Sequence, residues 1–347
     1  MSLLQQTINA IQPLDQKAMD EAQKRLDFLL KPQGSLGRLE SIARQMAGIT
    51  GKIQNNPDKK AIMVMCNDNG ITEESIASFP RNLSMLVADC MLRGLAGVSV
   101  LAKNAGADVR VVDLGLESDP PTPGIINRKI RRCTSNFANM AAMTREEAIQ
   151  AIEIGIEETN KAIDAGYNLI ATGEVGIGNT TTSSAMLHVF TGRSLEDVVG
   201  RGAGLTDEGL NHKRQVIRKA VELHKPNPAD PIDVLAKVGG FDIAGMAGTF
   251  LACAARRVPV VMDGFISGAA AVLACRLCPE AKNYIFPSHG SAEPGTKVIM
   301  DDLGMEPIMY MNMRLGEGTG AALGFQIIGA SMAMMNNMGT FADIGMG

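Results

Sequence analysis

The sequence predicts an α/β protein in which a mostly parallel sheet lies between two layers of helices, a Rossmann-like three-layer arrangement. Short apolar runs such as 61–66 and 169–175 show no polar alternation, which is typical of parallel strands buried on both faces. Helix-like segments separate these runs, as expected for strand–helix–strand units. With 347 residues, the chain is long enough for one large α/β domain with a smaller helical one.

Residues 13–30 are expected to form an amphipathic helix, because apolar side chains recur on one face. Asp15 lies at the start of this helix, as is typical of a helix N-terminus. Pro32 and Gly34 then break the helix, and Ser35 is a candidate N-cap for the next one.

The remaining elements alternate along the chain. A capping box of Thr144 and Glu147 predicts a helix that runs to Ala165. Further helices are expected over about 80–104 and about 207–223. The expected strands are 61–66, 109–114, 169–175, 258–262 and 284–286.

Three regions follow from this pattern. Residues 1–55 are expected to form a helical segment of a small domain, and residues 56–325 the α/β nucleotide-binding domain. Residues 326–347 are expected to return to the small domain as a C-terminal helix and tail. The apolar stretch 318–335 has the length of a short membrane span, but its small and polar residues favour a tightly packed interior helix.

Composition excludes several classes of function. A net charge of −4 gives no case for nucleic-acid binding, and the short basic run 128–132 is expected to be a solvated face or a phosphate-side patch. Six cysteines in a chain of this length do not form a disulfide framework, and Cys275 and Cys278 are expected to be buried thiols. The histidines show no metal-ligand spacing, so neither a metal nor a cofactor is expected. Residues 1–12 lack a signal-peptide pattern, which favours the cytoplasm.

A glycine-rich segment near the C-terminus carries the most distinctive candidate for catalysis. Glu317 stands between Gly316 and Gly318, beside apolar Met313 and Leu315, and an apolar helix-like stretch follows. Glycine permits a tight turn and the close approach of a ligand. A carboxylate on such a turn suits proton abstraction, although an exposed glutamate in a surface loop fits the same window.

A second segment, 173–182, follows a predicted strand and opens a helix with glycines and hydroxyl side chains. Free N–H groups and hydroxyls at a helix start favour a phosphate site, whereas a threonine-capped helix after a glycine turn fits equally well. Gly200–Gly204 forms a further glycine cluster, and Lys213 can neutralise a phosphate or remain solvated. His289 is a candidate for catalysis or for a structural hydrogen bond.

Polar residues gather where the predicted strands end, namely Asp68, Glu174, Asp263 and Ser288. Ligands of open α/β sheets bind outside the carboxyl ends of the strands. We therefore expect these residues to belong to one site.

A set of motifs, taken together, resembles the nicotinate-nucleotide–dimethylbenzimidazole phosphoribosyltransferase family nearly end to end. The motifs are 31–40 (KPQGSLGRLE), 173–176 (GEVG), 179–181 (NTT), 237–242 (KVGGFD), 263–265 (DGF), 287–289 (PSH) and 313–318 (MRLGEG). The resemblance implies a Rossmann-like sheet with an added helical domain, acting as a dimer. It also implies transfer of phosphoribose from nicotinate mononucleotide to an aromatic base, which yields an α-riboside 5'-phosphate and nicotinate for cobamide synthesis.

The resemblance assigns roles to residues. Glu317 matches the catalytic base, and Glu174 is expected to support positive charge or to orient the ribose. The nucleotide and its phosphate are expected to contact Gly176, Asn179, Thr180, Gly202, Lys213, Asp263, Phe265, Ser291 and Gly316. The acceptor pocket is expected to include Phe79, Val87, Met313 and Leu315.

Three departures from the family pattern leave the acceptor open. Asn69 stands where histidine is common, and Phe79 and Val87 stand where well-known members have Ser and Gln. A more apolar pocket discriminates less for benzimidazole. Phenol or p-cresol is the alternative acceptor, with the chain as one subunit of a heterodimer or as a non-catalytic partner. A dinucleotide-dependent oxidoreductase is disfavoured, because no G-x-G-x-x-G follows the first strand.

Overall fold

The computed structural model describes residues 1–346 and confirms the predicted α/β class. Within these residues, parallel strands form one sheet in the order β3-β2-β1-β4-β5-β6. The direction of strand addition reverses between β1 and β4, which is the switch point where ligands bind in Rossmann-type sheets. The strands are β1 (Lys60–Asn67), β2 (Ala107–Gly115), β3 (Ile126–Asn127), β4 (Leu169–Val175), β5 (Val260–Met262) and β6 (Ile285–Pro287).

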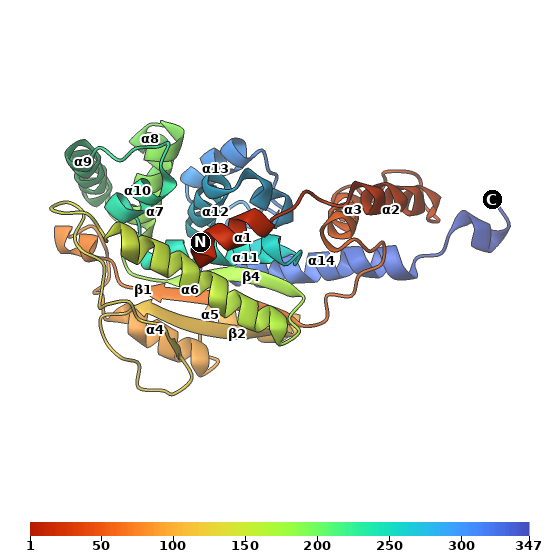
Figure 1. Ribbon diagram of the computed structural model, residues 1–347, viewed down its shortest axis with the longest axis horizontal. Helices are drawn as coiled ribbons and strands as arrows, with labels where there is room; N and C mark the ends of the chain where they lie inside the picture. Colours follow the sequence, from red (N-terminus) through yellow and green to blue (C-terminus); the bar gives the residue numbers. More distant parts are fainter. Residues whose placement is uncertain (347) are drawn as a thin grey trace.

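Helices cover both faces of the sheet (Figure 1). Side chains on β1 alternate between the faces: Met65 lies against Gly245 of α11, whereas Ile62 lies against Gly318 at the start of α14. The helices are α1 (Leu3–Ala10), α2 (Gln16–Phe28), α3 (Arg38–Thr50), α4 (Leu83–Leu92), α5 (Gly97–Ala105), α6 (Arg145–Asp164), α7 (Asn179–Thr191), α8 (Leu195–Val198), α9 (Asp207–His224), α10 (Pro231–Val238), α11 (Phe241–Ala255), α12 (Phe265–Leu277), α13 (Gly295–Leu303) and α14 (Thr319–Asn337).

Helices from both ends of the chain meet beyond the sheet. α2 packs on α3, and α3 packs on α14, so these elements lie side by side at one end of the molecule (Figure 1). α1 packs instead on α6 and α11. The domain boundaries at residues 55 and 325 stay a prediction, and α14 runs unbroken across the second of them.

Two predicted helix starts are confirmed and one is wrong. Asp15 accepts the N–H of Ala18 at 2.9 Å, and the capping box of α6 at Thr144 is complete. Ser35 does not cap α3, because a turn continues to Gly37 and the helix begins at Arg38. The carboxylate of Glu40, inside the helix, accepts the N–H of Leu36 at 2.8 Å in its place.

The single helix predicted over about 80–104 is also wrong, because the structure has two helices there. α4 ends at Leu92 and α5 begins at Gly97, and Gly94 between them has a φ of 75° that a helix cannot contain. The whole stretch Leu83–Ala105 is long and apolar enough, with a mean hydropathy of 1.7, to match a membrane span by length and composition alone. The break matters for the site, because it creates a helix N-terminus at Gly97.

The strands agree with the prediction except at their ends and at one edge. β5 begins at Val260, after Pro259, and β6 begins at Ile285. β3 was missed, because two residues are too few for a periodic pattern to indicate a strand.

Glycines allow α6 and α11 to pack unusually closely. A Cβ placed on Gly155 of α6 lies 2.0 Å from the carbonyl oxygen of Gly245, and a Cβ placed on Gly248 lies 2.1 Å from that of Ile152. The helices therefore touch backbone to backbone. α11 in turn packs on β1 and β4, so this contact helps to fix the layer beneath the site.

We predict that Gly155→Ala lowers the free energy of unfolding by about 1–3 kcal/mol, because the methyl group forces the helices apart. The matched control is Gly329→Ala in α14, where a Cβ meets nothing within 4 Å. That substitution is expected to stabilise the protein by up to about 1 kcal/mol, because alanine is the better helix former. Urea unfolding of both variants measures the difference, and equal effects would contradict the packing described here.

Candidate active site

The predicted turn around Glu317 is confirmed and lies against Ile62 of β1 and the carboxyl end of β4. Gly316, Glu317 and Gly318 all have positive φ, at 86°, 65° and 103°, and α14 begins directly after them. A glutamate whose backbone lies in the left-handed region is strained by about 1–3 kcal/mol, and this conformation persists only where the surrounding structure holds it in place.

Two buried acids from neighbouring strands hold this turn. Glu174, in β4, accepts the N–H of Glu317 through Oε1 at 3.1 Å. Asp263, which follows β5, accepts the N–H of Gly318 through Oδ2 at 3.1 Å and that of Ala321 through Oδ1 at 3.0 Å. The two carboxylates thus satisfy N–H groups at the start of α14 that have no partner within the helix.

Glycines also bring the turn against the sheet. A Cβ placed on Gly173 of β4 lies 2.2 Å from the carbonyl oxygen of Glu317, and one placed on Gly316 lies 2.2 Å from Oε1 of Glu174. A larger residue at Gly173 would displace the backbone of the turn, and one at Gly316 would displace the carboxylate of Glu174 and be strained by the positive φ. The sequence therefore specifies a direct contact between the turn and β4.

The side chain of Glu317 reaches the N-terminus of α5. Its Oε2 accepts the N–H of Val98 at 3.0 Å, which supplies the cap that Ala96 cannot provide. Burial raises the pKa of the Glu317 carboxyl, the bond from Val98 opposes this rise, and the charge of Asp263 adds to it. A raised pKa suits a carboxylate that takes up a proton.

A cavity of about 310 Å³ opens beside this turn. Predicted site residues that line it are Glu174, Gly176, Asn179, Thr180, Gly202, Asp263, Phe265, Ser291, Gly316 and Glu317, together with Val87 and Leu315. Burial raises the pKa of Glu174 to about 8, and the charges of nearby acids add to the rise. The cavity therefore joins segments that lie far apart in the sequence.

A smaller cavity of about 80 Å³ shares the segment Gly176–Thr180 with the large cavity and is also lined by Lys213 and Phe79. Lys213 is buried, and its Nζ donates to Oγ1 of Thr180 at 2.9 Å and to the carbonyl oxygen of Gly200 at 3.3 Å. Burial lowers the pKa of Lys213 to about 8. This ammonium group links the two glycine-rich segments and faces a space where an anion can bind.

Met313 is separated from the other predicted residues. It lines a shallow apolar groove with Leu95 and Val100 of the α4–α5 region, which Leu315 also borders. Phe79 is 48% exposed and lines the small cavity but not the large one. The four residues predicted for the acceptor pocket are therefore divided between three places: Val87 and Leu315 line the large cavity, Phe79 the small one and Met313 the groove.

Sequence reasoning missed several residues of the site. Glu293 and Arg314 line the large cavity, and Arg314 directly precedes the glycine-rich turn, which was a usable signal. The N–H of Val98 was missed because α4 and α5 were predicted as one helix. His289, which the sequence did single out, lines the cavity and makes a hydrogen bond, since its Nδ1 lies 2.9 Å from Oγ of Ser288.

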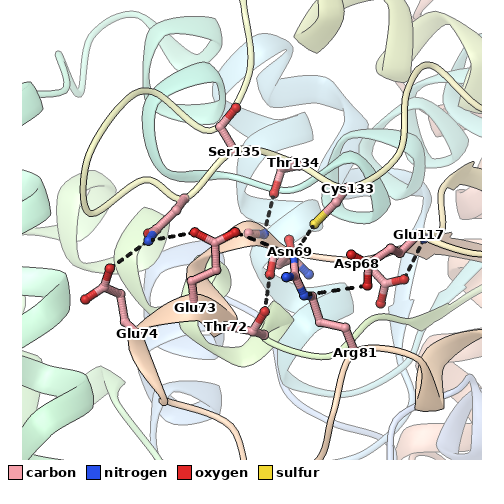
Figure 2. Close-up of polar contacts among 12 residues, drawn as sticks. Asp68, Asn69, Thr72, Glu73, Glu74, Arg81, Glu117, Cys133, Thr134 and Ser135 are labelled. Atoms are coloured by element: carbon pink, nitrogen blue, oxygen red, sulfur yellow. Dashed lines mark hydrogen bonds and ion pairs between the residues drawn. The ribbon is translucent and has the colours of Figure 1, made fainter.

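Of the four strand-end residues predicted to form one site, Glu174 and Asp263 line the cavity, whereas Asp68 and Ser288 do not. Oδ2 of Asp68 accepts the N–H of Glu117 at 2.8 Å, and Figure 2 shows Asp68 among the loops that follow β1 and β2, with Arg81 and Cys133. Arg81 lies 3.4 Å from the sulfur of Cys133 and 3.7 Å from a carboxylate oxygen of Glu117. This cluster ties the segment after β1 to the rim of the sheet.

The basic run 128–132 is paired with acids. Arg128 contacts Glu157 and Glu158, and Arg131 contacts Glu147 at 2.8 Å. Among residues 1–346, no group of three or more His, Cys, Asp or Glu side chains is placed to hold a metal ion.

Comparison with known proteins places the chain in a family. A family model described as Phosphoribosyltransferase (DBI_PRT) matches residues 11–346. Proteins named nicotinate-nucleotide–dimethylbenzimidazole phosphoribosyltransferase are similar over nearly the whole chain. The protein from Ruminiclostridium cellulolyticum is 54% identical over 98% of this chain and 96% of its own, and that from Acetivibrio thermocellus is 52% identical over 98% and 97%. The crystal structure of CobT from Thermus thermophilus superposes with a TM-score of 0.91 at 35% identity, covering 95% of this chain and 99% of its own.

We predict that sulfate protects the protein against thermal unfolding through Lys213, and that this protection fades as the pH rises through about 8, where the buried ammonium loses its proton. Sulfate is a suitable probe because it does not itself titrate in this range. Lys213→Met should abolish the pH-dependent part of the protection, whereas Lys219→Met, on the exposed side of α9, should retain it. Identical sulfate titrations for the two variants would remove Lys213 from the anion site.

Proposed function

The chain belongs to the DBI_PRT family of phosphoribosyltransferases, and on this basis we propose that it transfers phosphoribose from nicotinate mononucleotide to an aromatic base. The products are nicotinate and an α-riboside 5'-phosphate, which serves as the lower ligand of a cobamide. The observation that supports this most is the arrangement of Glu317 and Lys213. An acid on a rigid turn and a buried cation border two cavities that share the wall 176–180.

The phosphate of the donor is assigned to the smaller cavity. Lys213 and the hydroxyl of Thr180 supply donors there, and the close backbone of Gly202 leaves room for an anion. Burial lowers the pKa of Lys213, and a bound phosphate opposes this effect because it favours the charged ammonium group, with which it forms a buried ion pair. Binding energy from the phosphate then aligns the anomeric carbon, which is remote from it.

Glu317 is assigned the role of general base. The N–H or O–H of the acceptor is a weak nucleophile until its proton leaves, and a carboxylate with a raised pKa can take that proton. The bond from Val98 and the strained backbone hold the carboxylate in one orientation. The acceptor then attacks opposite to nicotinate, which converts the β-riboside into an α-riboside.

Glu174 and Asp263 are assigned to the charge that develops on the ribose. Bond cleavage to nicotinate leaves oxocarbenium character at the anomeric carbon, and buried carboxylates nearby stabilise a positive charge strongly. Both acids line the large cavity while they hold the turn of Glu317. Because each acid both lines the cavity and holds the turn of Glu317, the base and the charge-stabilising groups are fixed relative to one another.

The acceptor remains the open part of this proposal. The names of the relatives favour dimethylbenzimidazole. Val87 and Leu315 are two of the apolar residues that line the large cavity, and neither offers a hydrogen bond to a distal ring nitrogen. This favours a broad range of aromatic acceptors and keeps phenol and p-cresol as alternatives.

We propose a dimer, of identical chains or with a similar chain, that works in the cytoplasm. Large apolar side chains are exposed on α4, α5 and the segment before the Glu317 turn, namely Leu86, Leu95, Val100, Met311 and Leu315. Such a patch is typical of a surface that a second protein covers.

We predict that Glu317→Gln lowers kcat by about 10²–10⁴-fold, because the amide cannot take the proton of the acceptor. The Kd for nicotinate mononucleotide, measured by calorimetry, should change little. In the unsubstituted enzyme kcat should fall as the pH falls through the pKa of Glu317, at a higher pH than an ordinary glutamate titrates, because protonation removes the base. Glu306→Gln, on an exposed segment, serves as the control. Full turnover by the Glu317 variant would refute the assignment.

We predict that nicotinate is released with dimethylbenzimidazole and with p-cresol, and that Val87→Gln raises the preference for the benzimidazole by about tenfold or more. The added amide can bond the distal ring nitrogen, which p-cresol lacks. Val87→Leu adds bulk without a hydrogen bond and should leave the ratio of the two kcat/KM values nearly unchanged. Release with neither acceptor, from folded protein, would contradict the proposed function.

A further inference from the structure

Asp242 is a buried acid that the steps above do not use. It is the second residue of α11 and ends the motif 237–242. Its side chain is fully buried, and it is not one of the residues that line the two cavities within residues 1–346. A carboxylate without solvent is costly to retain, so its contacts indicate what it does.

One amide group joins Asp242 to Glu174. Nδ2 of Asn179 donates to Oε2 of Glu174 and, at 3.2 Å, to Oδ2 of Asp242. The other oxygen of Glu174 accepts the N–H of Glu317. A continuous chain of hydrogen bonds therefore runs from Asp242 through Asn179 and Glu174 to the turn that carries the proposed base.

Glycines confine the carboxylate of Asp242. A Cβ placed on Gly240 lies 2.5 Å from Oδ1 of Asp242 and 2.8 Å from Oδ1 of Asn69. One placed on Gly176 lies 2.1 Å from the carbonyl oxygen of Asn67 and 3.3 Å from Oδ2 of Asp242. Neither glycine has a positive φ, so the requirement at both positions is close approach.

The pair of acids is also coupled through charge. Burial raises the pKa of Glu174 to about 8 and that of Asp242 to about 7, and the charge of Asp242 adds to the rise at Glu174. Asp263, after β5, acts on Glu174 in the same direction. Burial raises the pKa of the Cys66 thiol of β1, and the charges of Asp242 and Glu174 add to that rise. Within residues 1–346, Oδ1 of Asp242 has no hydrogen-bond partner, so the bond from Asn179 to Oδ2 is the contact that connects this carboxylate to Glu174.

We propose that Asp242 is a positioning residue, which acts through Asn179 to fix the orientation and the charge of Glu174. Because two carboxylates share one amide, they hold fewer negative charges in the empty site than two separate acids would. Binding of a cationic pyridinium nucleotide then favours the fully ionised pair. The effect on turnover rests on the proposed function, whereas the coupling between the two acids does not.

The coupling is tested without turnover by Asp242→Asn, which keeps an acceptor for Asn179 and removes the charge. The titration of Glu174 is followed by ¹³C NMR of glutamate-labelled protein, with Glu174→Gln to assign the signal. The midpoint should move to lower pH in Asp242→Asn, because a like charge is gone. Asp113→Asn is the matched control and should leave the midpoint of Glu174 nearly unchanged. Asp113 is also buried, near the end of β2, but it accepts the N–H of Leu116 and pairs with Lys129. An unchanged midpoint in Asp242→Asn would overturn the proposal.

The effect on turnover is tested by kinetics over a range of pH. Asp242→Asn and Gly240→Ala, whose methyl group displaces the carboxylate, should each lower kcat by about tenfold to 100-fold, because Glu174 is misplaced. The KM for nicotinate mononucleotide should change less than kcat. The part of the pH profile that reports the ionisation of Glu174 should move to lower pH in Asp242→Asn only, because Gly240→Ala retains the charge. A lower melting temperature with an unchanged kcat and pH profile would make Asp242 merely structural. Failure of the unsubstituted enzyme to release nicotinate would refute the proposed function, while the NMR titration still decides the coupling.

Discussion

The site depends on hydrogen bonds between two buried carboxylates and the backbone of one turn. Glu174 and Asp263 come from separate strands, yet both accept N–H groups at the start of α14. Each acid is costly to bury, and those N–H groups offset part of that cost, since they too lack partners inside the helix. The strained conformation of Glu317 persists because this contact fixes the residues on both sides of it.

The parallel sheet makes this contact possible. β4 and β5 are neighbours, so the acids at their carboxyl ends lie at the same edge of the sheet. The reversal of strand order between β1 and β4 opens space at that edge. Gly173 and Gly176 lack a side chain, which allows the backbone of Glu317 and of Asn67, respectively, to lie close to them. α6 and α11 support the opposite face through their close backbone contact. Packing far from the cavity therefore sets how accurately the acids are placed.

Much of this arrangement could be predicted from the sequence, and the exceptions have physical causes. Unalternating apolar runs identified β1 and β4, and the glycines around Glu317 identified the turn before α14. Helix propensity alone did not reveal the break at Gly94, because the apolar pattern continues across it. Since the break was not predicted, the contact of Glu317 with the N-terminus of α5 was not predicted either. Asp68 was grouped with the other strand-end acids because a sequence does not show which way a side chain turns in a loop. The long-range contacts of Asp242 and Glu293 had no local signal at all.

The two sides of the cavity differ in how well they tolerate substitution, which affects how the sequence of such an enzyme can change during evolution. On one side of the cavity, Gly173 lies against the backbone of Glu317 and Gly316 lies against the carboxylate of Glu174. Any side chain at these two positions would collide, so substitutions there are not tolerated. Val87 on α4 and Leu315 carry ordinary side chains with room to vary, and both border the same space. Substitutions at Val87 and Leu315 can therefore reshape one side of the cavity in related chains, whereas the side built from glycines cannot accept larger residues.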